Sequence, residues 1–412
     1  MLLTQTLGGA LATGTHGQGL GNAGIYDAVH SITAILATGQ IHTSTQNDPA
    51  FNAWKLHLGC LGVIVKVEMI CEEIQVYRLE KSVTTFANLS ADGAYYSWNQ
   101  NAVHFKAWWF PETDAVQIWS SVDADKVETR QYWDGDAQII IKTAESLKLD
   151  ANVETAESNL ESKSSLIAPT TTANFNSTLD SLIQKMERET LATQSATTKL
   201  RSLAENTPNG RFATITRFKS QETRVGDMYQ LWCKGIPAPQ VNCEISVPMH
   251  NIENALKALH QYYNKSTPKP TLHYPFILRA TGTSSAWLSP AHSSRGHVCY
   301  IGFLVYLNDV TFEYDENTLR SLRDIEKILA LYGGIPHYGK FFTKSLYDFN
   351  KLLPDFGEFC AYRNRIDPGQ RFVNSFVEDM FSISVVGSGK PVSKRVDQSI
   401  MAKEEVAFVS RL

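Results

Sequence analysis

The sequence lacks several features that would place a protein in a class at once. No apolar run approaches the ~18 residues that a membrane-spanning helix needs. The 42 acidic and 38 basic residues nearly cancel, to a net charge of −4, which indicates no attraction to nucleic acid or to an anionic membrane. The six cysteines are scattered without a C-x-x-C pair. This spacing argues against a disulfide framework and against a zinc site.

The start of the chain also lacks the basic n-region of a secretory signal. What is present is 412 residues with 43% hydrophobic content, enough for two domains with substantial cores. The pattern predicts an α+β fold, strands dominant, with helices on one side of the sheets. The expected strands are a hairpin in SITAILATGQIHTS, a strand over 63–69 with one face well buried and the other partly buried, two strands joined by a Pro-Glu-Thr-Asp turn in HFKAWWFPETDAVQIWSS, a strand from 241, and strands in YPFILRATG and GHVCYIGFLVYLND. The expected helices are an amphipathic helix after the strand at 241 and helices over 176–206 and 316–331.

A glycine-rich stretch near the start, GGALATGTHGQGLGNAG, poses the main question. Its segment Gly19–Gly24 fits the dinucleotide fingerprint G-x-G-x-x-G. A Rossmann turn, however, needs a buried strand before the first glycine and a long helix after the last. The preceding residues are polar and the following apolar run is short, so a nicotinamide dehydrogenase ranks last among the hypotheses. Tight turns without a ligand, or a backbone cradle for a phosphate or a flat polar ring, remain open.

Several blocks in one order resemble the aldonolactone oxidases, FAD flavoproteins of the vanillyl-alcohol-oxidase type. The resemblance covers roughly 1–115, 228–310 and 325–376. The blocks that carry it are GGALATGTHGQG, NDPAFNAWKLHLGCLGVIVKVEM, HFKAWWFP, CEISVP, IPHYGK and RIDPGQRFVN. It implies oxidation of a sugar 1,4-lactone with O2 as the acceptor, and a cytoplasmic or peripherally membrane-associated protein.

The resemblance also implies roles for individual residues. Arg279 would orient the lactone, Lys340 would stabilise the reduced flavin near its N1/C2 edge, and His337 would shape the site. The residues expected to bind the cofactor are Gly9, Thr13, Gly14, Thr15, His16 and Gly17 at the pyrophosphate and ring, Gly62, Val63 and Ile64 at the adenosine half, and Lys340. No metal ligand is expected.

Two departures from the family pattern stand out. The family carries Glu-x-Arg on a strand facing the substrate, whereas this chain has Ile277 before Arg279. His292 and His273 are candidates for the missing polar role. The chain also starts almost at the second flavin segment, so we expect the first flavin-binding lobe to be missing.

These features predict four regions. They are the C-terminal half of a PCMH-type FAD-binding domain over 1–78, a substrate or cap domain over 79–350 with a divergent insertion over 122–225, a segment over 351–386 that returns to the flavin site, and a mobile tail over 387–412. The leading hypothesis is an FAD-dependent lactone oxidase of ascorbate-type biosynthesis that forms H2O2. The alternative is a truncated, non-catalytic relative that does not retain FAD.

Overall fold

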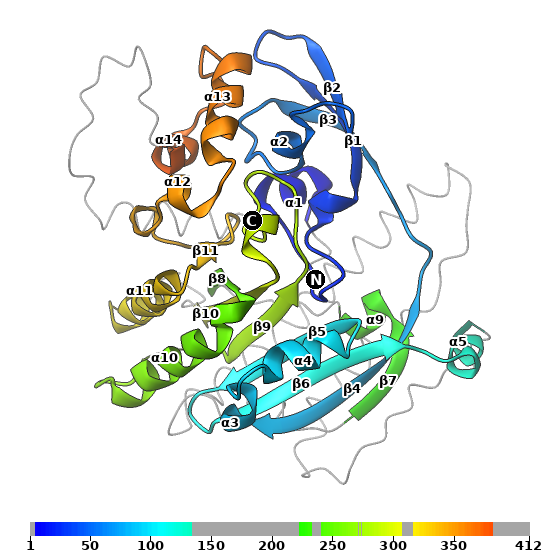
Figure 1. The fold of residues 1–412 in the computed structure, drawn as a ribbon, viewed down its shortest axis with the longest axis vertical. Coiled ribbons are helices and arrows are strands. Elements are labelled where there is room, and N and C mark those ends of the chain that lie inside the picture. The colour runs from blue at the N-terminus through cyan, green and yellow to red at the C-terminus, as the bar shows by residue number, and fades with distance from the viewer. Residues whose placement is uncertain are drawn as a thin grey trace.

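The computed structural model describes residues 5–133, 222–232, 240–270, 272, 274–306 and 316–381. The expected helix over 176–206, most of the insertion and the whole tail from 387 lie outside these residues. Within them the chain forms two sheets of unequal size with helices packed around them (Figure 1). This arrangement confirms the α+β prediction.

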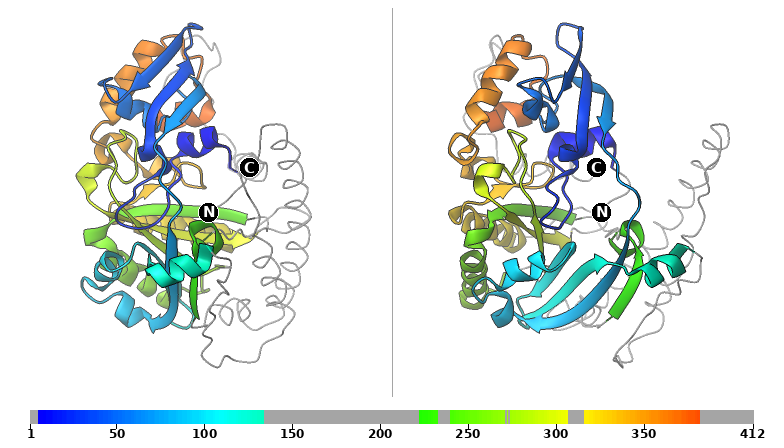
Figure 2. Two further views of the ribbon diagram at one scale, coloured as in Figure 1. Left: turned by 90° about the vertical axis from the view of Figure 1, so that its right-hand side faces the viewer. Right: turned by 45° about the vertical axis from the view of Figure 1, so that its right-hand side comes forward.

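The smaller sheet stands at one end of the molecule (Figure 2). Its three antiparallel strands follow the order β2 (Ile41–Thr45), β1 (Val29–Ile35), β3 (Val63–Met69). The hairpin prediction is confirmed by β1 and β2. The prediction of a well-buried face on β3 is wrong, because Val63 and Val65 are 54% and 55% exposed. Alternation alone predicts a strand, but it does not reveal whether a neighbour covers either face.

The larger sheet has eight strands that pair antiparallel. Their order is β11 (Ile335–Pro336), β8 (Gln240–Pro248), β10 (Val298–Tyr306), β9 (Phe276–Thr281), β5 (His104–Phe110), β6 (Ala115–Asp123), β4 (Val76–Thr85) and β7 (Glu222–Asp227). Strands that are distant in sequence, such as β8 and β10, therefore lie side by side. The strands predicted within 104–121, from 241, within 274–282 and within 296–309 are confirmed by β5 and β6, β8, β9 and β10.

One face of the large sheet is covered by helices. The helices are α3 (Phe86–Leu89), α4 (Ala94–Gln100), α10 (Ile252–Lys265) and α11 (Glu316–Leu331). In α10 the buried residues Ile252, Ala255, Leu256 and Leu259 follow helical spacing and pack with alternate residues of β8 in one core. The expected helix over 316–331 is confirmed, and the chain turns sharply after it at Gly333, whose φ is +78°.

The opposite face of the large sheet carries a different set of side chains. At its β4–β7 end an aromatic cluster includes Trp108 and Trp119, and α9 (Met228–Trp232) packs there, with α5 (Lys126–Trp133) beside it. At its β8–β9 end the same face carries polar residues. Among the described helices, those on this face therefore lie at one end of the sheet only, away from the polar residues.

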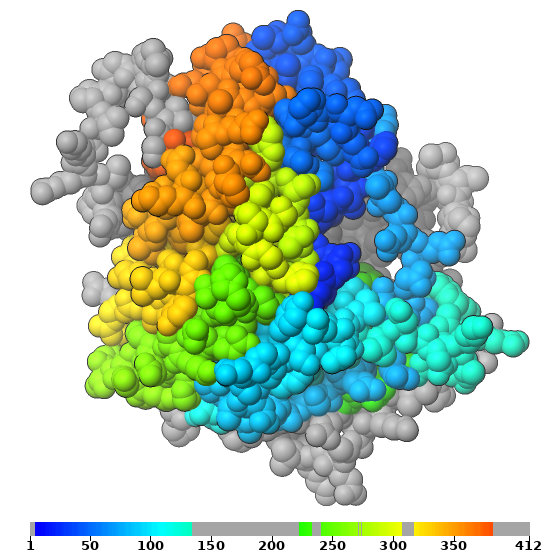
Figure 3. Space-filling view, in the orientation of Figure 1, coloured from blue at the N-terminus to red at the C-terminus, as the bar shows by residue number. Residues whose placement is uncertain are grey.

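The first and the last segments of the described residues meet beside the small sheet. Figure 3 shows the C-terminal segment, in orange, against the N-terminal segment, in blue. The helices involved are α1 (Leu7–Thr13), α2 (Phe51–Lys55), α12 (Phe349–Leu352), α13 (Phe356–Ile366) and α14 (Ser375–Phe381). The indole N–H of Trp54 donates to the hydroxyl of Tyr362 at 2.9 Å, which fixes α2 against α13. We did not predict α1, because its glycines favour turns.

Candidate functional site

Strand alternation decides which residues of β8 reach the site. Cys243, Ile245 and Val247 belong to the core under the helices, so Glu244 and Ser246 point to the other face. The register places Gly302 of β10 opposite both Glu244 and Ile277, and Tyr300 opposite Arg279. Polar side chains from three neighbouring strands thus share one face.

A buried carboxylate is the centre of this site. The side chain of Glu244 is fully buried, and its Oε2 lies 2.5 Å from Lys340 Nζ and 3.3 Å from His16 Nε2. Its Oε1 accepts a hydrogen bond from the guanidinium of Arg279. We call the following set the Glu244 cluster: His16, Glu244, Arg279, Tyr300, His337 and Lys340.

The glycine-rich segment delivers His16 to this cluster. Helix α1 ends at Gly14, which adopts the left-handed conformation that caps helices. The chain then doubles back, and Ile25 N–H donates to the Thr15 carbonyl. The ring of His16 stacks on Tyr300, with centroids 3.5 Å apart. Its Nδ1 lies 3.0 Å from the Gly17 carbonyl oxygen.

The turn after β11 delivers His337 and Lys340. It runs along β8, since the His337 N–H donates to the Glu244 carbonyl and the Phe341 N–H to the Asn242 carbonyl. The Gly339 N–H donates to His337 Nδ1 at 3.0 Å, so a neutral His337 ring carries its proton on Nε2. A Cβ at Gly339 would lie 3.0 Å from Thr13 Oγ1. The end of α1 and this turn are therefore in close contact.

The charges in the cluster do not cancel. Burial alone would raise the pKa of Glu244, but Arg279 and Lys340 outweigh it and hold that pKa well below its usual range. Burial lowers the pKa of Lys340, and Glu244 partly offsets this. Burial also lowers the pKa of both histidines, that of His337 strongly. With neutral histidines, two cations face one carboxylate, which leaves one net positive charge.

This charge distribution suits an anion better than a metal ion. The ligand atoms of His16, Glu244 and His337 lie within 4.8 Å of one another, the spacing of a metal site. Both oxygens of Glu244 already bind cations, however, and Lys340 would repel a third. The side chains of Arg279 and Lys340 are each 21% exposed, so both extend partly out of the interior.

The catalytic and flavin-binding residues predicted from the sequence fall in two places. His16, Arg279, His337 and Lys340 meet in the cluster, with Thr13 and Thr15 close by, and the Thr15 hydroxyl is buried without a partner. Residues 62–64 lie apart from the cluster, where β3 begins in the small sheet. A Cβ at Gly62 would lie 2.9 Å from the Ile35 carbonyl oxygen. This contact gives Gly62 a packing role of its own.

The residues that we expected to replace the missing glutamate do not join the cluster. His292 binds the Asp355 carboxylate through Nε2 at 2.9 Å and the Ser294 hydroxyl through Nδ1 at 2.9 Å. His273 lies outside the described residues. Sequence reasoning missed Glu244 and Tyr300. A detectable sign of Glu244 was a charged residue inside the otherwise apolar CEISVP strand.

The Gly19–Gly24 segment does not form a dinucleotide turn. Gly19 has a φ of +107°, its N–H donates to the Ala280 carbonyl, and a Cβ there would lie 2.2 Å from the Val103 carbonyl oxygen. The next strands, β1 and β2, form an antiparallel hairpin instead of a βαβ unit. The glycine at position 19 therefore serves close packing of the loop against the large sheet.

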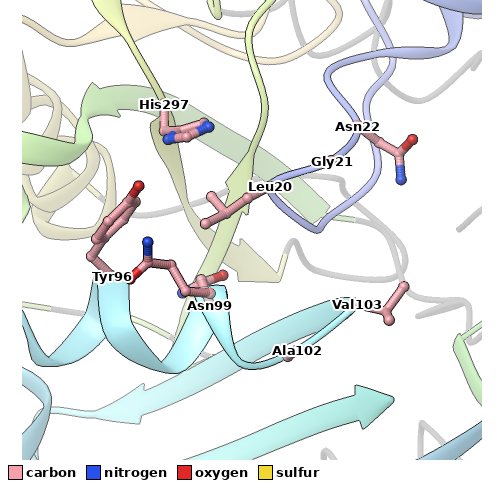
Figure 4. Close-up of a pocket in the computed structure, with 9 residues that line it drawn as sticks. Leu20, Gly21, Asn22, Tyr96, Asn99, Ala102, Val103 and His297 are labelled. Atoms are coloured by element: carbon pink, nitrogen blue, oxygen red, sulfur yellow. The ribbon is translucent and has the colours of Figure 1, made fainter. Parts of the chain in front are cut away.

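Part of the same segment lines a separate pocket of about 410 Å³. Figure 4 shows Leu20, Gly21 and Asn22 on one side, with Tyr96 of α4 and His297 nearby. Helix α4 packs on the helix-covered face, whereas the Glu244 cluster lies on the other face of the sheet. The two sites are distinct.

Comparisons with known proteins identify the family of the chain. The sequence profile described as D-arabinono-1,4-lactone oxidase matches residues 67–380. The mouse L-gulonolactone oxidase is 25% identical over 379 residues, which cover 91% of this chain and 73% of that protein. The L-gulono-1,4-lactone dehydrogenase of Mycobacterium tuberculosis is 22% identical over 374 residues, covering 90% and 73%.

A solved structure supports the fold. A cholesterol oxidase from Brevibacterium sterolicum superposes with a TM-score of 0.57 at 14% identity, covering 91% of this chain and 75% of that one. Among the described residues, no helix has both the length and the apolar character to cross a bilayer. Since the profile covers most of the chain, this protein belongs to the D-arabinono-1,4-lactone oxidase family, whose cofactor is FAD.

Proposed function

We propose that this protein oxidises the CH–OH group of a sugar 1,4-lactone of the gulono-, galactono- or arabinono- type, in an ascorbate-type biosynthetic step. Oxidation to C=O removes two electrons and two protons, and their transfer to O2 forms H2O2. The observation that carries the proposal is the pairing of Arg279 and Lys340 on one buried carboxylate, in a chain of this family.

The residues that would hold FAD fit its chemistry at the ring. The excess positive charge of the cluster suits a flavin edge that becomes anionic on reduction, and the partnerless Thr15 hydroxyl is a free donor beside it. When bound, FAD supplies the two-electron acceptor of the reaction. The proposed ligands are Gly9, Thr13, Gly14, Thr15, His16, Gly17 and Lys340 for the pyrophosphate and ring, and Gly62, Val63 and Ile64 for the adenosine half.

The chain's own residues bind and orient the reactants. Arg279, whose side chain is partly exposed, offers its guanidinium to an oxygen of the lactone. Lys340 places an ammonium group where negative charge develops, which is the form of electrostatic stabilisation that contributes most in buried sites. His337, held neutral with its proton on Nε2, offers a hydrogen-bond donor.

We also propose the domain assignment that this function requires. Residues 1–78, with the small sheet, form the C-terminal half of the FAD-binding domain, and residues 79–350, with the large sheet, form the substrate domain. Residues 351–386 return to the cofactor side. The contact between Trp54 and Tyr362 supports this return.

The test is an absorbance spectrum of the purified chain with and without FAD, followed by turnover of the three lactones. We expect flavin bands near ~450 nm that persist through gel filtration, and peroxide formation with at least one lactone. A chain that stays colourless after FAD addition contradicts the proposal and favours a non-catalytic relative. If the lactone bleaches the flavin bands but no peroxide forms, the electron acceptor is a molecule other than O2.

A matched pair of variants tests the role of Lys340. Lys340→Met should lower turnover by about 10²–10³-fold, because it removes a preorganised charge from the transition state. The control is Lys351→Met, since Lys351 has an 83% exposed side chain on the surface. Equal turnover in the two variants would contradict the role of Lys340.

A further inference from the structure

The Arg279–Glu244 contact joins residues on strands that are not adjacent. Glu244 lies on β8 and Arg279 on β9, with β10 between them. The residue of β10 opposite Glu244 is Gly302. A Cβ at Gly302 would lie 3.6 Å from Glu244 Oε1 and 3.5 Å from Ile277 Cβ. These are ordinary van der Waals distances, so a methyl group would fit at 302, whereas a larger side chain would meet Glu244 where it extends across β10 to Arg279.

Glu244 does not have the properties of a catalytic base. Its side chain is fully buried, so it does not reach a lactone hydroxyl. Its pKa lies well below the usual range because two cations favour the charged form. A carboxylate of this kind holds its neighbours in place and does not take up a proton near neutral pH.

We propose that Glu244 is the positioning residue of the proposed lactone oxidation, whose buried carboxylate fixes the Arg279 guanidinium and the Lys340 ammonium side by side. This role rests on the proposed function. Ile277, on the same face of β9, offers no hydrogen-bond acceptor, so Glu244 supplies the carboxylate at this end of the face.

The consequence concerns the ionisation of Lys340. The groups that face its ammonium are Glu244 and Cys243 from β8, Arg279 from β9, His16 from the loop and His337 from its own turn. Glu244 favours the protonated lysine, whereas burial and Arg279 disfavour it. Removing the carboxylate should therefore make Lys340 lose its proton at lower pH, and removing Arg279 should have the opposite effect.

Competitive acetylation of Lys340 with acetic anhydride, quantified by mass spectrometry against pH, measures this ionisation in the full chain without flavin or lactone. We expect Glu244→Gln to lower the labelling midpoint by more than about one pH unit. Glu244→Asp, which keeps a carboxylate, should have a midpoint near that of the wild type, and Arg279→Gln should raise the midpoint. The matched control is Glu326→Gln, because Glu326 is also a buried carboxylate but binds Thr343 and Tyr347. This control should leave the midpoint unchanged.

An unchanged midpoint in Glu244→Gln would overturn the proposal, whether or not the chain oxidises lactones. If Glu244→Gln does not fold, two other variants decide the question. Arg279→Gln should raise the labelling midpoint of Lys340, and Gly302→Val should lower it, because a larger side chain at 302 meets Glu244 where it crosses β10.

In the flavin-loaded protein, Glu244→Gln should lower kcat/KM by about 100-fold and move the alkaline limb of the kcat profile to lower pH. A lower kcat/KM with an unmoved pH profile would indicate a structural role only and would also contradict the proposal.

Discussion

The two sheets of this protein differ in how they are supported. In the large sheet, every residue of β10 from Val298 to Val305 is buried, because helices cover one face and polar or aromatic side chains pack on the other. In the small sheet, Val63 and Val65 on β3 are more than half exposed. The Glu244 cluster therefore lies on a sheet that is packed on both faces, whereas residues 62–64 lie on a sheet with an exposed face. We expect the second region to open more readily than the first.

The largest expected loss of stability comes from a substitution in the large sheet. Glu244→Gln leaves Arg279 and Lys340 without their shared counterion, which should lower the free energy of unfolding by about 3–5 kcal/mol at neutral pH. The folded pKa of Glu244 is lower than its unfolded value of 4.5. Its stabilisation is therefore fully present above pH 4.5 and lost as the pH falls through the folded value.

Urea unfolding of both proteins between neutral and acidic pH checks this prediction. The gap between wild type and variant should narrow below pH 4.5. A gap that is constant or grows on acidification would show that the carboxylate is not charged in the folded chain. Arg279→Gln keeps the carboxylate and one cation, so it should cost less.

A smaller loss of stability is expected at Gly62, where β3 of the small sheet begins. Gly62→Ala places a methyl group 2.9 Å from the Ile35 carbonyl oxygen, so the backbone must shift, at a cost of about 1–3 kcal/mol. The control is Gly21→Ala, because nothing lies within 4 Å of a Cβ at Gly21. Thermal or urea unfolding measures both, and equal stability of the two variants would show that β3 adjusts freely.

The smallest expected effect compares a buried position of the large sheet with an exposed position of the small sheet. Ile301→Val in β10 removes one methyl group from a fully buried side chain and should cost about 0.5–1.5 kcal/mol. Val65→Thr on the outer face of β3 should stay within about 0.5 kcal/mol. Similar losses in the two variants, measured by urea unfolding, would mean that the outer face of β3 is covered in solution.

Most of the sheet structure could be predicted from local patterns. The Pro-Glu-Thr-Asp turn between two extended stretches located β5 and β6, and the helical spacing of apolar residues located α10. The prediction failed where the answer depended on neighbours. Helix α1 forms in a glycine-rich segment because the Thr6 side chain caps it and Leu11 packs in the core, and such tertiary support is invisible to propensity.

The site was predictable to the same degree. Family motifs identified His16, Arg279, His337 and Lys340, and the structure brings these four together. They could not identify Glu244, since its importance depends on two cations from distant segments and on the gap at Gly302. Nor could they show that His292 binds Asp355, which lies 63 residues away.

The contact between His16 and Glu244 spans 228 residues of sequence, and Lys340 joins it from a still later segment. Contacts of such separation close the largest loops of a chain and form late in folding. The cluster therefore assembles only when the segments that carry His16, Glu244 and Lys340 have come together, because no partial structure that lacks one of them can form it. A nascent chain brings Lys340, the second cation beside Glu244, into place only after the turn that follows β11 has been made, so the charges of the cluster are complete only once residue 340 lies against β8.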